Sequence, residues 1–174
     1  DLDVNLLVSQ AAHLVAKQEL GVALPARASE LERQLADGMN ARDGQLRVYG
    51  REDWNAPVAS GSNPADAMVV CPCSMGTLAA IAHGLSDNLI ERAADVMLKE
   101  QKKLILVPRE TPFSTLHLEN MLALSRMNAV ILPANPGFYH HPHAVEALVD
   151  FVVARILDQL GVQHALMARW GEDH

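Results

Sequence analysis

Strand-like apolar runs that alternate with helix-start signals are the feature that most restricts the fold. Residues 67–71, 103–107 and 129–132 are short runs dominated by aliphatic side chains, and Ser9, Ser74 and Ser114 stand where helix N-caps belong. Strands buried on both faces read as continuous apolar runs, and parallel strands need helical crossovers. The pattern therefore predicts an α/β protein with a parallel sheet covered by helices on both faces.

The remaining predicted elements extend this alternation over residues 1–174, which we expect to form a single domain. Further strands are predicted at residues 3–8 and 46–49. A helix is predicted to begin at Ser29, with Glu32 completing a capping box. Other helices are predicted from Ser74 to Gly84, from about 88 to 102, from Ser114, and from about 144 to 160.

Composition excludes several classes of protein. Aromatic residues make up only 4% of the chain, which suits helices on a sheet, and the net charge of −7 argues against a nucleic-acid partner. Cys71 and Cys73 flank one proline, a spacing that rarely forms a disulfide. No apolar run is long enough to span a bilayer and no signal peptide opens the chain, so we expect a cytoplasmic protein without a membrane partner.

Ligands of such sheets bind beyond the carboxyl ends of the strands, here after Val8, Cys71, Val107 and Leu132. Ser9 reads first as a helix cap, although a serine there can also donate to a phosphate or a flavin. The segment 71–77 favours an anion-binding or cofactor-binding loop. It lacks zinc-ligand spacing, and nothing specific supports a catalytic thiol.

Three other segments leave two interpretations open. Arg109 and Glu110 are either solvated charges or a phosphate-recognition pair. The segment 137–143 contains three histidines, but a polar loop with Tyr139 as a phosphate donor is favoured over a metal site. The charges of residues 88–99 also have two interpretations. Glu91, Asp95 and Lys99 are spaced four residues apart, which fits exposed pairing along a helix. Arg92 and Lys99 share a face of that helix, which fits contacts with a ligand.

Several long segments, in the same order, resemble the UbiX family of flavin prenyltransferases. The resemblance covers nearly the whole chain and is carried by residues 60–62, 71–79, 88–100, 106–112, 117–122, 137–140, 153–157 and 169–171.

The resemblance implies a flavodoxin-like, Rossmann-like, doubly wound parallel sheet and a metal-independent prenyl transfer. The family joins dimethylallyl phosphate to the N5 and C6 atoms of reduced FMN, and the product, prenylated FMN, serves UbiD-type decarboxylases in ubiquinone biosynthesis. Members assemble as homododecamers with sites at subunit junctions. We accordingly expect the tail, about 161–174, to pack on a neighbouring subunit.

The resemblance also assigns roles to individual residues. The catalytic positions are Glu19, Glu110 and Tyr139. The FMN-binding positions are Ser9, Ser74, Met75, Gly76, Thr77 and Arg109. The positions around the donor phosphate are Gly61, Arg92, Lys99, Tyr139 and Arg155, with Glu110 beside them, and Trp170 forms a wall near the prenyl chain. Cationic side chains there would stabilise the leaving phosphate, and Trp170 would stabilise allylic cation character.

Two departures from the family pattern stand out. The family opens with a strand and a Gly-Ala-Ser-Gly loop for the FMN phosphate, so we expect a segment ahead of Asp1; the family's Ser-Lys pair is here Ser9-Gln10. The alternatives are an FMN-dependent cysteine decarboxylase of the same fold and a non-catalytic FMN-binding subunit. The cations Arg92, Lys99 and Arg155 suit a phosphate-bearing substrate better than the substrate of a cysteine decarboxylase. The presence of the catalytic positions argues against a non-catalytic subunit.

Overall fold

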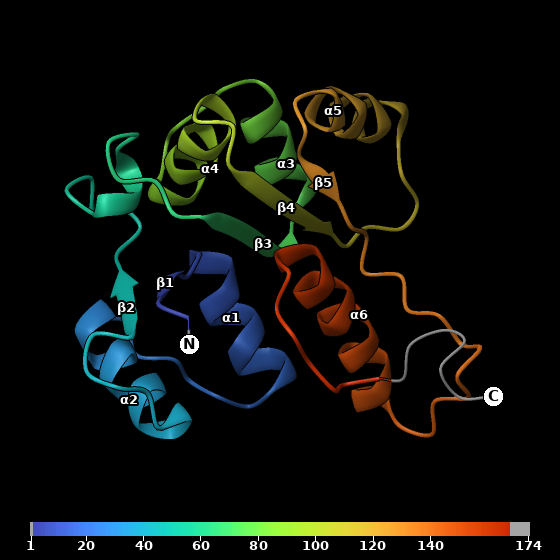
Figure 1. The fold of residues 1–174 in the computed structure, drawn as a ribbon, viewed down its shortest axis with the longest axis horizontal. Helices are drawn as coiled ribbons and strands as arrows, with labels where there is room; N and C mark the ends of the chain where they lie inside the picture. The colour runs from blue at the N-terminus through green and yellow to red at the C-terminus, as the bar shows by residue number, and fades with distance from the viewer. Residues whose placement is uncertain (1, 168–174) are drawn as a thin grey trace. The chain divides into compact units, whose positions relative to one another are not determined.

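The computed structural model describes residues 2–167, shown as a ribbon in Figure 1. These residues form two compact units, and each is described by itself. Unit 1 contains residues 2–64 and 84–100, and unit 2 contains residues 65–83 and 101–167.

Unit 1 is built on a pair of parallel strands, β1 (Val4–Leu7) and β2 (Leu46–Tyr49). Its helices are α1 (Gln10–Glu19), α2 (Ala28–Met39), the 3-10 helix η1 (Pro57–Ala59) and α4 (Leu89–Lys99). Leu31 of α2 is buried, as are the two inward side chains of β2, Leu46 and Val48. The amphipathic pattern of α2 thus places one helix against the strand pair.

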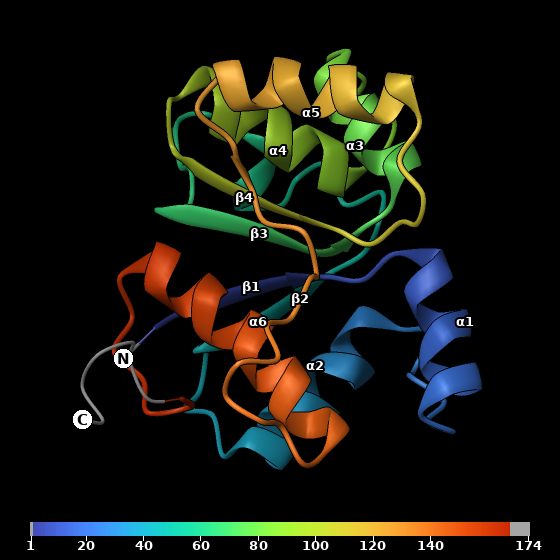
Figure 2. The same ribbon diagram turned by 90° about the vertical axis from the view of Figure 1, so that its right-hand side faces the viewer.

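Unit 2 has three layers. Its sheet consists of the parallel strands β3 (Ala67–Cys73), β4 (Lys103–Pro108) and β5 (Val130–Ile131) in that order. Helices α3 (Met75–Ala82) and α5 (Thr115–Arg126) cover one face and α6 (Val145–Leu160) covers the other (Figures 1 and 2). Ile105 and Val107 of β4 pack with Ile156 of α6, so aliphatic side chains fill this core. The predicted parallel α/β architecture is confirmed.

Most predicted elements are found within one to three residues of their expected bounds, with one wrong capping signal. Ser9, Ser74 and Ser114 are the N-caps of α1, α3 and α5. The predicted cap at Ser29 is wrong, because α2 begins at Ala28 after Arg27 and has no side-chain cap. Glu32 accepts a hydrogen bond from the Val48 N–H at 2.7 Å instead.

Two further predictions are corrected. The helix predicted to reach residue 102 ends at Lys99, and Gln101 turns the chain with a left-handed φ of 54°. The run 67–71 was predicted to be buried on both faces, yet its first four residues are half-buried and Cys71 is exposed. Within the described residues β3 has a hydrogen-bonded neighbour along one edge only, which explains the exposure.

The strand register brings three loops of unit 2 to one edge of the sheet. Cys73 at the end of β3 lies opposite Pro108 at the end of β4. Beyond β5, the Ala134 N–H donates to the Pro108 carbonyl at 3.0 Å. The loops that follow β3, β4 and β5 are therefore neighbours at the carboxyl edge. No helix of the described residues is long and apolar enough to cross a membrane.

Candidate functional site

The turn after β3 presents the N-terminus of α3. Ser74 is the N-cap, and its Oγ accepts a hydrogen bond from the Thr77 N–H at 3.1 Å and donates to Thr77 Oγ1 at 3.1 Å. The first N–H groups of an α-helix, here those of Met75 and Gly76, have no acceptor within the helix. Together with the helix dipole they favour an anion or an electron-rich ligand edge.

Met75 and Gly76 differ in what they offer to a ligand. Met75 is buried, so its side chain belongs to the core of unit 2 and only its main chain is available. Gly76 is exposed, and a Cβ there would meet nothing closer than Ser74 Oγ at 3.8 Å. Open space above an exposed main chain allows a flat ligand to approach, which fits a flavin ring.

Arg109 and Glu110 follow β4 directly and lie beside the Ser74 turn because of the register of Cys73 with Pro108. Both side chains are exposed. Glu110 Oε1 accepts a hydrogen bond from the Thr111 N–H at 3.2 Å, so this carboxylate is tied to its own loop. Arg109 therefore follows β4 on a loop next to the start of α3, and a planar guanidinium on this loop offers donors for a phosphate or a flavin carbonyl.

The thiols near this turn are poor nucleophiles. Cys71 is exposed as a residue, but partial desolvation of its thiol raises its pKa. Burial together with the negative charge of Cys71 raises the pKa of Cys73 to about 12. A thiol attacks as the thiolate, so a raised pKa removes its reactive form near neutrality. The geometry gives a catalytic cysteine no support.

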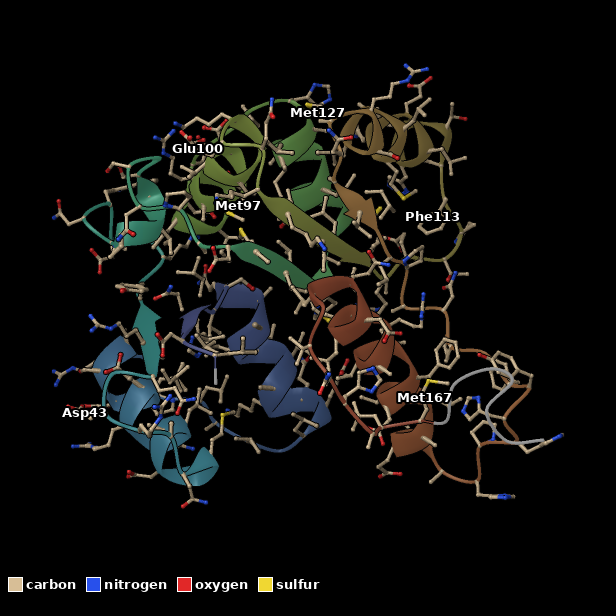
Figure 3. The ribbon with its side chains drawn as sticks, viewed as in Figure 1. Asp43, Met97, Glu100, Phe113, Met127 and Met167 are labelled. Atoms are coloured by element: carbon tan, nitrogen blue, oxygen red, sulfur yellow. The ribbon has the colours of Figure 1, made fainter. Side chains whose placement is uncertain are left out.

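In unit 1, α4 holds two predicted phosphate-binding cations against one loop. Arg92 donates from Nε to the Ala59 carbonyl at 2.9 Å and from Nη1 to Asp95 Oδ2 at 2.9 Å. Lys99 Nζ bonds Glu100 Oε1 at 2.7 Å, and a Cβ on Gly61 would overlap both of these atoms. Figure 3 labels Glu100 at the end of α4.

Of the two interpretations of the α4 charges, the exposed-pair interpretation has the wrong partners, and the ligand-contact interpretation stays a prediction. Asp95 pairs with Arg92 rather than Lys99, and Glu91 accepts from the Asp87 N–H at 2.9 Å. Both cations instead contact the loop around Gly61, because residues seven apart lie on one helix face. The structure brings Gly61, Arg92 and Lys99 together.

In unit 2, Tyr139 belongs to an aromatic cluster beside α6. Its ring packs edge-on against Phe151, with ring centroids 6.0 Å apart, and His140 stacks on Phe151 at 5.6 Å. A Cβ on Gly137 would lie 2.7 Å from Tyr139 Cε1 and 3.1 Å from Phe151 Cε2, so a side chain there would displace the Tyr139 ring. The buried His140 Nδ1 has no hydrogen-bond partner among the described residues.

Arg155 lies one turn beyond Phe151 on α6, and both line a pocket of about 250 Å³ between α6 and the segment that contains β5. Arg155 Nη1 donates to Asp158 Oδ2 at 2.6 Å. The pocket walls are mostly aliphatic, with Asn135 and Gln159 as further polar residues. A cation among the lining residues of a small pocket with both polar and apolar surface suits a short alkyl phosphate.

Two further predicted residues, Ser9 and Glu19, belong to unit 1. Ser9 Oγ accepts from the Ala12 N–H at 3.1 Å, and Glu19 is the exposed last residue of α1. A second pocket of about 580 Å³ in unit 1 begins beside Ser9 and is lined by Gln10, His13, Tyr49 and Arg51, among others. Trp170 lies outside the described residues.

Sequence reasoning missed the acidic partners of two of these cations and the aromatic residue that lines a pocket with Arg155. Asp95 and Asp158 each follow an arginine by three residues, a spacing that signals a helix pair. Phe151 precedes Arg155 by four residues, another same-face spacing. No group of three or more His, Cys, Asp or Glu side chains in residues 2–167 is placed to hold a metal ion.

These features define an α/β protein whose parallel sheet carries a helix N-terminus and an arginine at its carboxyl edge. The Flavoprotein family model matches residues 1–157. The chain is 59% identical to flavin prenyltransferase UbiX of Pseudomonas aeruginosa over 172 residues, covering 99% of this chain and 82% of that protein. It is 45% identical to UbiX of Methanocaldococcus jannaschii, covering 97% and 84%. The chain therefore belongs to the Flavoprotein family and, within it, to the UbiX-type flavin prenyltransferases.

Solved structures agree with this assignment. AnUbiX (PadA1), solved with FMN and dimethylallyl pyrophosphate, is 42% identical and superposes with a TM-score of 0.83 over 99% of this chain and 84% of that one. A dodecameric FMN-dependent UbiX-like decarboxylase from Escherichia coli O157:H7 is 44% identical, with a TM-score of 0.82 over 95% and 82%. The flavodoxin-like fold predicted from the sequence is confirmed.

A more distant likeness concerns the fold alone. The cypemycin decarboxylase CypD is 18% identical and superposes with a TM-score of 0.53 over 90% of this chain. Low identity transfers no chemistry between proteins that share a fold. The cysteine decarboxylase alternative thus gains no support, and the assignment of this chain as a prenyltransferase stands.

Proposed function

We propose that this chain joins a dimethylallyl group from dimethylallyl phosphate to the N5 and C6 atoms of reduced FMN and releases inorganic phosphate. The observation that carries the proposal is the adjacency of the α3 N-terminus and Arg109 at one edge of the parallel sheet, set by the pairing of Cys73 with Pro108. This arrangement fits a flavin, because it offers main-chain donors, open space at Gly76 and a planar cation.

FMN is the proposed cofactor and prenyl acceptor, held by Ser9, Ser74, Met75, Gly76, Thr77 and Arg109. Reduced FMN supplies the nucleophilic atoms when it is bound. The residues of this chain orient it: Thr77 and Ser74 order the helix start, and Arg109 fixes one edge by its fork of donors. The FMN-containing AnUbiX structure and the FMN-dependent enzyme of Escherichia coli support this part of the proposal.

Gly61, Arg92, Lys99, Tyr139 and Arg155 are proposed to bind the donor phosphate. As the allylic C–O bond breaks, its electron pair leaves with the phosphate, and the three cations stabilise the growing negative charge. Trp170 is proposed as the wall of the prenyl site. The binding of dimethylallyl pyrophosphate to AnUbiX supports an allylic donor, and we propose the monophosphate for this chain.

Glu19, Glu110 and Tyr139 are proposed to move protons during the transfer. Alkylation of N5 would release one proton, and ring closure at C6 would take up one proton at the allyl double bond and release one from the ring, so these residues would accept and supply protons. Glu110 is solvent-exposed and held by the Thr111 N–H, so it can exchange protons with water.

The wider setting follows from the same proposal. Prenylated FMN would pass to a UbiD-type decarboxylase in cytoplasmic ubiquinone biosynthesis. A homo-oligomer, a dodecamer as described for the Escherichia coli relative, would complete the sites at subunit junctions. We propose residues 1–174 as one flavoprotein-like domain whose tail, about 161–174, packs on a neighbouring subunit.

Anaerobic incubation of the full-length, FMN-loaded protein with reductant and dimethylallyl phosphate tests the proposal. The expected result is a flavin heavier by one dimethylallyl unit in the mass spectrum, and parallel reactions with the pyrophosphate identify the preferred donor. A peptide ending in cysteine serves as the rival substrate. Oxidative decarboxylation of that peptide without any prenylated flavin would refute the transferase.

A further inference from the structure

Arg155 is one end of a continuous series of hydrogen bonds. Its Nη1 donates to Asp158 Oδ2 at 2.6 Å, and the other carboxylate oxygen, Oδ1, lies 3.2 Å from His164 Nε2. The Leu166 N–H in turn donates to His164 Nδ1 at 3.4 Å. Asp158 therefore uses both of its oxygens, one toward Arg155 and one toward a residue beyond the helix.

The hydrogen bond from the Leu166 N–H determines the tautomer of His164. Because Nδ1 accepts from a main-chain N–H, the ring proton of neutral His164 is on Nε2, which donates to Asp158. The side chain of His164 is only 9% exposed, whereas that of Arg155 is 51% exposed. The series thus runs from a buried, fixed ring to an exposed guanidinium at the edge of the α6 pocket.

The turn after α6 makes this contact possible. Gly161 adopts a left-handed φ of 71°, and the Val162 N–H donates to the Leu157 carbonyl at 3.0 Å. The chain then folds back so that His164 reaches Asp158 from outside the helix. A side chain at position 161 would be strained in this conformation, so the glycine serves the return of the segment.

Stability alone does not account for this arrangement. A solvent-exposed ion pair three residues apart on a helix contributes little to folding. A fixed guanidinium contributes to binding in another way, because a long side chain that is already ordered loses less entropy when a ligand binds. One Nη1 hydrogen is used by Asp158, and the other donors remain available for phosphate oxygens.

We propose that Asp158 is a positioning residue that aims Arg155 at the phosphate of the allyl donor, and that His164 fixes Asp158. This inference rests on the proposed function, which assigns Arg155 to that phosphate. Asp158 is thus a positioning residue that does not itself contact the phosphate. Through His164 it links Arg155 to the chain segment that follows α6.

Donor binding to full-length protein loaded with oxidised FMN tests the inference, because no turnover occurs in that state. Calorimetric titration with dimethylallyl phosphate should show about tenfold weaker binding for Asp158→Asn, the scale of a lost charge-assisted contact. In an Arg155→Ala background the same change should alter binding by less than about twofold, since the two residues act as a unit. The FMN dissociation constant should stay unchanged.

His164 and a matched control refine the test. His164→Gln retains a terminal N–H near the position of Nε2 and should bind the donor better than His164→Ala. Glu146→Gln removes an exposed acid from the first turn of the same helix and should leave donor affinity unaltered. Unchanged donor affinity in Asp158→Asn, or an equal loss with and without Arg155, would overturn the inference.

Crystal structures of the wild type and Asp158→Asn separate this inference from the proposed function. A displaced Arg155 guanidinium in the variant supports positioning even if the wild type forms no prenylated flavin. An Arg155 that keeps its place in the variant refutes positioning even if prenyl transfer is demonstrated.

Discussion

The Nζ atom of Lys99 lies so close to Gly61 that a Cβ atom built there would overlap it, and the same holds for Glu100 Oε1. The absence of a side chain at position 61 is what lets the Lys99–Glu100 pair sit against the loop. Both overlapping atoms are the far ends of flexible side chains, so a methyl group would displace the charges rather than unfold the unit.

Gly61→Ala should therefore weaken donor binding while leaving stability nearly unchanged. We expect the KM for dimethylallyl phosphate to rise about tenfold, because a displaced Lys99 loses a charge-assisted contact. The free energy of unfolding should change by less than about 1 kcal/mol. Gly38→Ala is the matched control: nothing lies within 4 Å of a Cβ there, and this helix position should gain roughly 0.5–1 kcal/mol without a change in KM. Steady-state kinetics and urea denaturation provide both measurements.

Ser74→Ala separates a capping role from a cofactor role. Its Oγ accepts from the Thr77 N–H at 3.1 Å, and Ser114 caps α5 in the same way, accepting from the His117 N–H at 3.2 Å. Each alanine variant should lose about 1 kcal/mol of stability, the typical value of an N-cap. Only Ser74→Ala should also weaken FMN binding, measured by quenching of flavin fluorescence. Equal FMN affinity in both variants would mean that Ser74 is a cap and nothing more.

Local interactions were predictable from the sequence, and distant ones were not. The caps at Ser9, Ser74 and Ser114 each bond an N–H group three residues away, so a short segment contains the whole signal. Ser29 has the same local pattern, but the capping box predicted there does not form. Its Glu32 accepts a hydrogen bond from the Val48 N–H of β2 instead. A propensity argument has no access to that competing partner.

The same distinction applies to the candidate site. The strand-end loops that carry Ser74 and Arg109 were located in advance, since parallel strands bring their carboxyl ends to one edge. The bond from Arg92 to the Ala59 carbonyl spans 33 positions and depends on how α4 meets the loop. The return of His164 to Asp158 depends on the backbone turn at Gly161. Both arise from packing that no spacing rule encodes.

The buried thiol of Cys73 predicts a loss of stability at high pH. Its pKa is about 12 in the folded protein, above the value of 9.0 for an unperturbed thiol. Above pH 9 the unfolded chain loses this proton while the folded protein retains it, so stability falls as pH rises toward 12. The slope contributed by this one proton is at most about 1.4 kcal/mol per pH unit. Urea denaturation from pH 8 to 11 should show a shallower decline in Cys73→Ala than in the wild type.

Arg92→Lys tests whether the shape of the guanidinium matters as well as its charge. Arg92 bonds the Ala59 carbonyl through Nε and Asp95 through Nη1, two directions that one ammonium group cannot reproduce. The lysine variant should bind the donor about tenfold more weakly, because the loop around Gly61 loses its tie to α4. FMN affinity should be unaffected. Arg33→Lys, an exposed substitution on α2, provides the control for exchanging one cation for the other. If Arg92→Lys binds the donor as tightly as the wild type, charge alone is required and the bond to the Ala59 carbonyl contributes nothing to binding.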